Sequence, residues 1–315
     1  MLAVPFPSNA DTFTVCDITH LSIIQLQGPQ AKVFLQGQLT CDVMTLADQQ
    51  WCWGAHCDPT GKMNSAFRLY QANNETLMLI LPTTLIEHQI AQLQKYAVFH
   101  QVTITQAPLT LIGLLGTDLL PKLQQQGLHA SQPGVYPLPQ AEATILIDNP
   151  QQALIIAPSN TSPSWLPESS TWQPCDLWQQ QDILQAYPYF EAAHVQKFIP
   201  QMLNLHAING ISFDKGCYIG QETIARLKYR GGLKRALYVL AGSATQSVAV
   251  GDQVAWQLET GLKKVGEVLQ VVQHEQVCLL TCVMNNTLST DATFKLVADE
   301  LSHLTVQTLP YTIPT

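Results

Sequence analysis

The chain has 315 residues, with 15 Lys and Arg against 23 Asp and Glu, a net charge of −8 and a pI near 5.5. This length allows two or three domains with a substantial core. The acidic balance excludes broad, non-specific nucleic-acid binding, which depends on net positive charge. The start, MLAVPFPSNADTF, lacks the features of a signal peptide, and no segment has the roughly 18 apolar residues of a membrane span.

The eight cysteines form no CxxC pair and no spacing typical of a zinc site, so we predict free thiols, no metal and a cytoplasmic location. Cys278 and Cys282 lie four residues apart in an apolar run, which places them on one face of a strand, in the core.

Strands and helices alternate through the first half of the chain. Thr84 and Glu87 have the spacing of a capping box for a helix, and Asp58, Pro59 and Gly61 suit a type I turn. The expected elements are strands at 13–18 and 22–27, a helix to 38, a hairpin of 51–57 and 62–71, a strand at 75–81, the capped helix, a strand at 110–115, a helix at 118–126, and strands at 143–147 and 153–157.

The second half begins with a linker at 158–174 that is rich in Pro, Ser and Thr. Helices are expected at 176–186 and 221–230, and beyond Gly232 short alternating strands at 236–240, 265–272 and 277–283 predict a separate small β-barrel. The predicted fold class is α+β. The predicted domains are an N-terminal region (1–157), a linker, helix and signature region (158–232) and the barrel (233–315).

The segment KGCYIGQET, residues 215–223, is the most informative motif. Gly216 and Gly220 flank Cys217 and permit turn conformations, and Cys217 precedes the predicted helix at 221–230. The helix dipole and the charge of Lys215 would both favour the thiolate, which predicts a reactive cysteine. The alternative is that Cys217 is a small buried apolar residue.

A basic cluster follows at once, with five cations and no acid within ten positions: Arg226, Lys228, Arg230, Lys234 and Arg235. Such a cluster focuses positive potential and would bind a polyanion such as phosphate, RNA backbone or several carboxylates. The alternative is that the first three cations offset the dipole at a helix C-terminus. That alternative does not cover Lys234 and Arg235, which lie beyond two glycines.

Other candidate chemistry has less support. His56 and Cys57 are neighbours on a predicted strand and point to opposite faces, which disfavours a joint metal site or triad. The Gly61–Lys62 pair lacks the rest of a phosphate loop, and there is no GxSxG elbow. Trp178 lies on the predicted helix after the linker, where it would either stack on a flat heterocycle or belong to the core.

Seven sequence blocks give the chain a resemblance to the YgfZ-type folate-binding proteins of the glycine-cleavage T-protein superfamily. They are QGQLTCDV from Gln36, AHCDPTGKM from Ala55, KYAVF from Lys95, FIPQ from Phe198 with NL at Asn204, GISFDKGCYIGQE from Gly210, VMNN from Val283 and LPY from Leu309. The resemblance implies an aminomethyltransferase-like, three-domain cloverleaf with a C-terminal β-barrel. It also implies a central folate site that the signature cysteine faces.

The implied ligand is tetrahydrofolate, often with a polyglutamate tail. Carried over to this chain, the site would comprise Cys217 with Lys215 as its support, and as cofactor-binding residues Trp178, Leu21, Gly216, Tyr218, Gly220, Gln221, Glu222, Arg226, Lys228 and Arg230. Three positions depart from the superfamily pattern. Ser65 and Ala66 replace an acidic pair, Leu184 replaces a pterin-binding glutamate, and Leu21 replaces an aromatic residue.

These features lead to one expectation of function and two alternatives. The resemblance implies a folate-binding accessory protein without independent enzymatic activity, which supports iron–sulfur enzymes, including those that thiomethylate tRNA. The enzymatic alternative is a folate-dependent one-carbon transferase, which the missing acidic pair disfavours. The third hypothesis is direct tRNA binding through the basic cluster.

Overall fold

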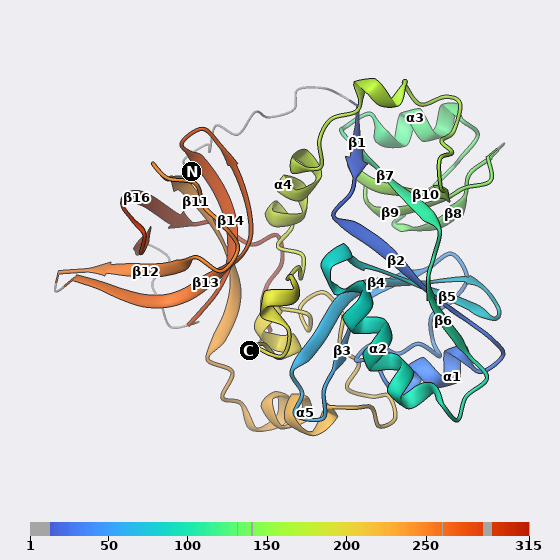
Figure 1. The fold of residues 1–315 in the computed structure, drawn as a ribbon, viewed down its shortest axis with the longest axis horizontal. Coiled ribbons are helices and arrows are strands. Elements are labelled where there is room, and N and C mark those ends of the chain that lie inside the picture. Colours follow the sequence, from blue (N-terminus) through green and yellow to red (C-terminus); the bar gives the residue numbers. More distant parts are fainter. Residues whose placement is uncertain (1–12, 131, 140, 260, 286–291, 315) are drawn as a thin grey trace.

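The computed structural model describes residues 13–130, 132–139, 141–259, 261–285 and 292–314. These residues form two five-stranded sheets and a closed six-stranded barrel. The barrel lies on one side of the molecule and the two sheets on the other, with helix α4 between them (Figure 1). Residues 1–12, on which the signal-peptide expectation depends, and Asn286 of the VMNN block lie outside the described residues.

The first sheet has the antiparallel order β3-β4-β5-β2-β6. In the β3–β4 hairpin the Gly61 amide donates to the Asp58 carbonyl oxygen at 2.9 Å, which confirms the predicted turn. The elements of this region are β2 (Leu21–Gln27), α1 (Ala31–Gln36), β3 (Trp51–Cys57), β4 (Met63–Asn73), β5 (Thr76–Pro82), the 3-10 turn η1 (Thr83–Leu85), α2 (Ile86–Ala97) and β6 (Thr103–Gln106).

The second sheet has the order β1-β7-β10-β9-β8 and is also antiparallel. Strands β1 and β2 are consecutive in the chain but belong to different sheets, so the chain crosses between the sheets at Thr19 and His20. The elements are β1 (Thr14–Ile18), β7 (Leu109–Leu115), α3 (Leu119–Gln125), β8 (Gly134–Pro137), β9 (Thr144–Asn149) and β10 (Gln152–Pro158).

The C-terminal barrel has the order β11-β14-β13-β12-β15-β16 and closes through the pairing of β11 with β16. Closure leaves no unpaired sheet edge. Cys278 and Cys282 are both 0 % exposed, as predicted. The strands are β11 (Arg235–Ser243), β12 (Gln253–Leu258), β13 (Gly261–His274), β14 (Val277–Asn285), β15 (Thr293–Leu296) and β16 (Asp299–Val306).

Between the second sheet and the barrel, the chain is mostly irregular. Helix α5 has the bounds that the sequence predicts, and α4 ends two residues earlier than predicted. The elements are η2 (Ser169–Thr171), α4 (Asp176–Leu184), η3 (Ala192–His194), η4 (Pro200–Leu203) and α5 (Gln221–Arg230). The α+β class with a terminal barrel is confirmed.

Some local predictions were wrong or incomplete. The 3-10 turn η1 precedes α2, the N-cap position falls at Leu85, and no side chain caps the helix, so Thr84 and Glu87 do not form a capping box. Strands β6, β8, β12, β15 and β16 were not predicted. Because β6 and β8 lie at sheet edges and have only four residues each, they show little periodicity.

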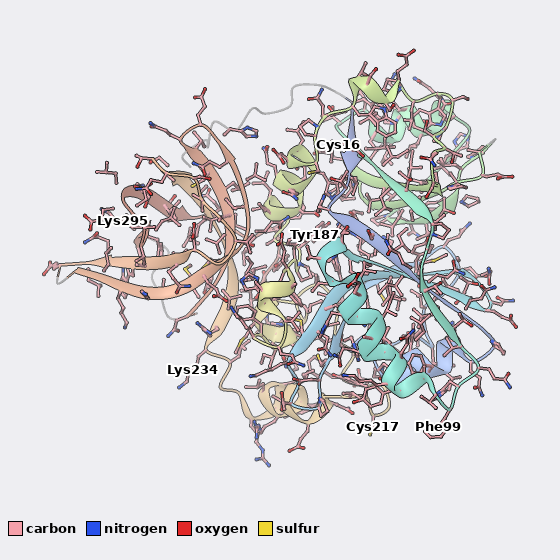
Figure 2. The ribbon with its side chains drawn as sticks, viewed as in Figure 1. Cys16, Phe99, Tyr187, Cys217, Lys234 and Lys295 are labelled. Atoms are coloured by element: carbon pink, nitrogen blue, oxygen red, sulfur yellow. The ribbon has the colours of Figure 1, made fainter. Side chains whose placement is uncertain are left out.

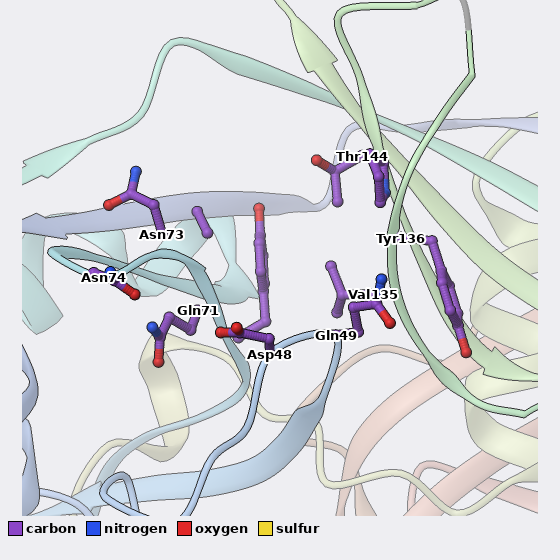
Figure 3. Close-up of a pocket in the computed structure, with 11 residues that line it drawn as sticks. Asp48, Gln49, Gln71, Asn73, Asn74, Val135, Tyr136 and Thr144 are labelled. Atoms are coloured by element: carbon purple, nitrogen blue, oxygen red, sulfur yellow. The ribbon is translucent and has the colours of Figure 1, made fainter.

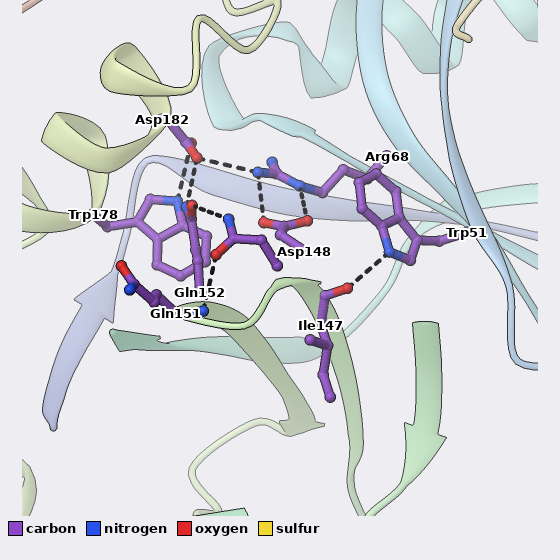
Figure 4. Close-up of polar contacts among 9 residues, drawn as sticks. Trp51, Arg68, Ile147, Asp148, Gln151, Gln152, Trp178 and Asp182 are labelled. Atoms are coloured by element: carbon purple, nitrogen blue, oxygen red, sulfur yellow. Dashed lines mark hydrogen bonds and ion pairs between the residues drawn. The ribbon is translucent and has the colours of Figure 1, made fainter. Parts of the chain in front are cut away.

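A buried ion-pair network joins the two sheets to α4 (Figure 4). Arg68 on β4 donates to both carboxylate oxygens of Asp148 on β9 at 2.9 Å, and to Asp182 on α4 at 3.1 Å. The guanidinium also lies 4.5 Å from the centre of the Trp53 ring. Burial raises the pKa of Asp148 to about 6, against the lowering effect of Arg68. These contacts fix the position of α4 between the sheets.

In the part of the chain that the structure describes, no helix is both long enough and apolar enough to cross a membrane.

Candidate functional site

The signature segment, residues 210–223, docks through its backbone on the segment that follows α1. The Ser212 amide donates to the Thr40 carbonyl oxygen at 2.9 Å, and the Thr40 hydroxyl donates to the Gly210 carbonyl oxygen at 2.6 Å. The Ile219 amide donates to the Gly37 carbonyl oxygen at 3.2 Å. The QGQLTCDV block therefore serves as the backbone platform for the signature segment.

Two glycines from distant motifs meet where α5 begins. Gly220 has φ +83°, and a Cβ on it would lie 2.6 Å from the Asp58 carbonyl oxygen and 2.9 Å from the Gly61 Cα. Gly61 has φ +85°, and a Cβ there would lie 2.9 Å from the Thr223 Cβ. Only glycine suits both the left-handed backbone and this close approach. The DPTG turn thus holds the start of α5 in place.

Cys217 is the exposed cysteine of the chain: of the eight, all described, five are buried and two are partly buried. It lies at the edge of the molecule on the side that carries α5 (Figure 2). It precedes the helix, as predicted, and its exposure rules out the buried alternative. Gly216 beside it has an unstrained φ, and a Cβ built on it would meet no described residue within 4 Å apart from its chain neighbours.

Lys215 has a structural role that was not predicted. The residue is 8 % exposed, and its ammonium donates to the Leu39 and Cys41 carbonyl oxygens at 2.8 and 2.7 Å, above the Tyr218 ring. Burial lowers the pKa of Lys215, and the charges of Cys41 and Asp42 oppose that effect. These hydrogen bonds direct the ammonium to the QGQLTCDV block, so Lys215 anchors the loop. Its support of the Cys217 thiolate stays a prediction.

Three further signature residues have structural contacts. Tyr218 is 7 % exposed and packs in the core, so its contact with a ligand stays a prediction. The Gln221 side-chain oxygen accepts a hydrogen bond from the Tyr218 amide at 3.3 Å and so closes the loop. Glu222 is exposed in the first turn of α5, where a carboxylate complements the helix dipole.

Trp178 and Leu21 are core residues, which agrees with the core alternative for Trp178, and their predicted ligand contacts stay predictions. Trp178 is 0 % exposed, and its indole donates to Asp182 at 3.0 Å. A Cβ on Gly113 would lie 2.7 Å from the Trp178 ring, so this glycine makes room for the indole. Leu21 is 6 % exposed and packs in the same cluster. Leu184, by contrast, is 41 % exposed.

The basic cluster divides into separate environments. Lys228 lies 5.6 Å from the Phe213 ring centre and lines a cavity beside the C-terminal segment. Arg235 lines a different cleft at the base of the barrel. Arg226, Arg230 and Lys234 are exposed and form no ion pair within the described residues. The sequence predicted one patch, but the chain turns at Gly231 and Gly232 and separates its members.

The cleft beside Arg235, which we call the basal cleft, gathers cations from three segments. Its volume is about 520 Å³, within the usual range of ligand sites. Lys62 of the hairpin, Arg235 and Lys264 of the barrel line it and form no ion pair within the described residues. The Glu267 carboxylate in the cleft is engaged by Lys197 at 3.1 Å. The His194 imidazole lies 3.5 Å from it, but burial lowers the pKa of His194, so this ring adds little positive charge. The excess positive charge suits an anion.

Sequence reasoning missed Lys62 and Lys264 as site residues. The sequence position of Lys62 could have indicated a site residue, because Lys62 directly follows the DPTG turn. In the structure, that turn also contacts the signature segment. Nothing in the sequence indicated Lys264, because its place in the cleft depends on the register of β13 with β12.

Another cavity, of about 400 Å³, lies between the two sheets and differs in charge (Figure 3). Its polar lining consists of amide, hydroxyl and carboxylate side chains, without a cation. The polar side chains are those of Asp48, Gln49, Gln71, Asn73, Asn74, Tyr70, Tyr136 and Thr144. This cavity therefore lacks the charge that an anionic ligand requires.

The strand next to the DPTG turn carries no acid–base pair or metal site. Ser65 and Ala66, at the positions of the superfamily acids, are 0 and 3 % exposed, and the Ser65 hydroxyl donates to Gln89 at 2.8 Å. His56 accepts a hydrogen bond from the Gln89 amide at 3.0 Å. No group of three or more His, Cys, Asp or Glu side chains suited to a metal occurs among the described residues.

The buried histidines predict acid sensitivity. Burial lowers the pKa of His56 and of His20 to about 4 from the ordinary 6.5. Because the unfolded chain binds these protons more readily, stability is fully present above pH 6.5 and declines as the pH falls towards 4. For His56 alone we expect a loss on the order of 3 kcal/mol across this range. Urea unfolding of the wild type and of His56→Gln, at matched pH values, measures it.

Asp148 also titrates in this range. Because its pKa is raised in the folded protein, its protonation increases stability as the pH falls, which opposes the effect of His56. The difference between wild type and His56→Gln separates the two contributions. The free energy of unfolding of His56→Gln should decline less steeply between pH 6.5 and 4. Parallel pH profiles would contradict the assignment.

Comparisons with known proteins identify the architecture first. The GCVT N-terminal domain model matches residues 10–142, and the YgfZ beta-barrel domain model matches residues 233–300. The crystal structure of glycine cleavage system aminomethyltransferase T from Bartonella henselae superimposes with a TM-score of 0.70 at 15 % identity, covering 95 % of this chain and 86 % of that one. The chain thus has the aminomethyltransferase fold with a YgfZ-type barrel.

Whole-length relatives then give the family. The tRNA-modifying protein YgfZ of Yersinia pseudotuberculosis is 35 % identical, and the alignment covers 98 % of this chain and 96 % of the relative. The Yersinia enterocolitica protein of the same name is also 35 % identical, with coverage of 95 % and 93 %. The chain belongs to the YgfZ family.

Proposed function

We propose that this protein is a cytoplasmic, tetrahydrofolate-binding accessory protein that supports iron–sulfur enzymes, including enzymes that modify tRNA. The observation that carries the proposal is the presentation of Cys217: the segment around it is anchored by Lys215 and Gly220, while the thiol itself is exposed. Relatives covering the full chain are named tRNA-modifying proteins, which supports the link to tRNA.

In this proposal, the carboxylate end of the folate binds in the basal cleft. A folate ends in carboxylates, and a polyglutamate tail adds more. Lys62, Arg235 and Lys264 supply three cations without a carboxylate of their own, and Glu267 is already paired. Arg226 and Arg230 on the exposed face of α5 would extend the positive potential along a longer tail.

Accessory action fits the residues better than one-carbon transfer. Amine chemistry on folate needs a general acid or base, and the strand positions that would supply the acids hold Ser65 and Ala66. A single exposed cysteine also falls short of the four ligands usual for an iron–sulfur cluster. We therefore place the cluster on the partner enzyme and a thiol-dependent supporting step on Cys217.

Direct contact with tRNA is the second candidate. The exposed cations Arg226, Arg230 and Lys234, free of ion pairs within the described residues, favour it. In that case the basic face of α5 would meet phosphates instead of glutamate carboxylates.

Replacement of Cys217 by serine tests the leading proposal. In cells that lack the native protein, the variant should restore less than about a tenth of iron–sulfur-dependent tRNA thiomethylation, because a serine hydroxyl is a much weaker nucleophile than a cysteine sulfur. The purified variant should still bind tetrahydrofolate like the wild type, as measured by calorimetry, since the cleft is unchanged. Cys52→Ser, on β3, is the control and should retain activity.

Full restoration by Cys217→Ser would refute the thiol's role. Absence of tetrahydrofolate binding by the wild-type protein would refute the ligand independently of the cell assay.

A further inference from the structure

The cavity between α5, the turn after it and the C-terminal segment has no role in the proposed function. Its volume is about 450 Å³, a size that fits a small molecule. Figure 1 shows the C-terminus close to the chain that leads from α5 into the barrel. Apolar side chains dominate the lining: Phe213, Leu227, Leu233, Ala236, Tyr238, Ile313 and Pro314. We call it the tail cavity.

A buried acceptor without a partner lies in its wall. Gln201 is only 3 % exposed, and its side-chain nitrogen donates to the Ile224 carbonyl oxygen at 2.7 Å. That bond fixes the amide, so the side-chain oxygen is the free end, and it makes no hydrogen bond within the described residues. Buried acceptors are almost always satisfied, and an exception inside a cavity points to a missing donor.

The rim of the cavity carries a positively charged side chain. Lys228 lines the cavity, is exposed, and forms no ion pair within the described residues. Its ammonium lies 5.6 Å from the centre of the Phe213 ring, at the edge of the apolar lining. His206 and Tyr238 are the other titratable groups of the lining. Burial lowers the pKa of His206 and raises the pKa of Tyr238, so neither side chain adds charge at pH 7. An anionic group would be attracted to Lys228.

We propose that the tail cavity binds a planar aromatic carboxylate that carries a ring N–H. The ring occupies the apolar lining beside Phe213 and Tyr238, the carboxylate meets Lys228, and the N–H donates to the Gln201 side-chain oxygen. Each part of the ligand thus contacts one of the three features of the cavity wall. The site is independent of the folate proposal, because the basal cleft has different lining residues.

A matched ligand series tests the proposal on the full chain by NMR titration. The probes are indoleacetate, its N-methylated form, which lacks the donor, and methylindole, which lacks the carboxylate. Indoleacetate should saturate with a Kd below about 1 mM. It should bind at least about fivefold more tightly than either of the other two, because each loses one polar contact.

Variants assign the contacts. Lys228→Gln should weaken indoleacetate at least about fivefold and leave methylindole unchanged. Lys234→Gln, an exposed cation outside the lining, is the control and should change neither Kd. Gln201→Met should abolish the advantage of indoleacetate over its N-methylated form. If Gln201→Met does not fold, the ligand series and the Lys228→Gln variant still test the proposal.

Two results would overturn the proposal: no saturable binding of indoleacetate up to about 5 mM, or equal affinity for all three probes. An unchanged Kd in Lys228→Gln would also overturn it, since the carboxylate would then have no partner at the rim.

Discussion

Replacing Arg68 by methionine should lower the free energy of unfolding by about 3–5 kcal/mol, the largest loss that we expect from a single side chain. Arg68 is 3 % exposed and bonds to Asp148 and Asp182. Without the guanidinium, two buried carboxylates would remain side by side with no cation. Urea unfolding at pH 7, followed by circular dichroism and tryptophan fluorescence, measures the change.

The control is Arg226→Met, because Arg226 is exposed on α5 and has no ion pair within the described residues. It should change stability by no more than about 0.5 kcal/mol. Adding Asp148→Asn and Asp182→Asn to Arg68→Met should recover part of the loss, since the uncompensated charges disappear. A loss below about 1 kcal/mol in Arg68→Met alone would contradict the assigned role.

This network could not be predicted from the sequence. Asp148 on β9 and Asp182 on α4 lie 80 and 114 residues after Arg68 on β4. Each is an ordinary charge in its own local segment, and only the packing of the two sheets against α4 brings them together. The same packing buries Trp178, because its ring lies against Gly113 of β7; within α4 its indole donates to Asp182.

Local patterns, by contrast, predicted local structure well. The turn at Asp58–Gly61 and the helix Gln221–Arg230 follow from turn residues and from a glycine before a polar helical run. The glycines on either side of Cys217 predicted its exposure, and the resemblance predicted the fold. It did not reveal how the loop is held, because the contacts of Lys215 are with backbone carbonyls, which leave no trace in side-chain patterns.

The charge pattern of the sequence identified the cationic residues but did not predict where they lie in the structure. Five cations within ten residues suggested one anion site, but a helix followed by two glycines sends Lys228 and Arg235 to different cavities. Gly231 and Gly232 have φ values of +69° and +98°, so the chain turns sharply between α5 and the barrel. Residues from elsewhere, Lys62 and Lys264, complete the basal cleft.

Gly220→Ala is the second large effect that we expect. The substitution should destabilise the protein by at least about 2 kcal/mol, because alanine is disfavoured at φ +83° and its Cβ would lie 2.6 Å from the Asp58 carbonyl oxygen. The obstructing atoms are backbone, so they cannot rotate aside. The DPTG turn and the start of α5 would have to separate, which would also displace Cys217.

Gly216→Ala is the matched control from the same loop. A Cβ there meets nothing within 4 Å and the φ value is unstrained, so its effect should stay within about 0.5 kcal/mol. Urea unfolding gives the two stabilities, and limited proteolysis of the signature loop reports separation from the hairpin directly. Gly220→Ala should be cleaved several times faster than the wild type. Equal stability and equal cleavage for the two variants would mean that the contact between Gly61 and Gly220 does not hold the loop.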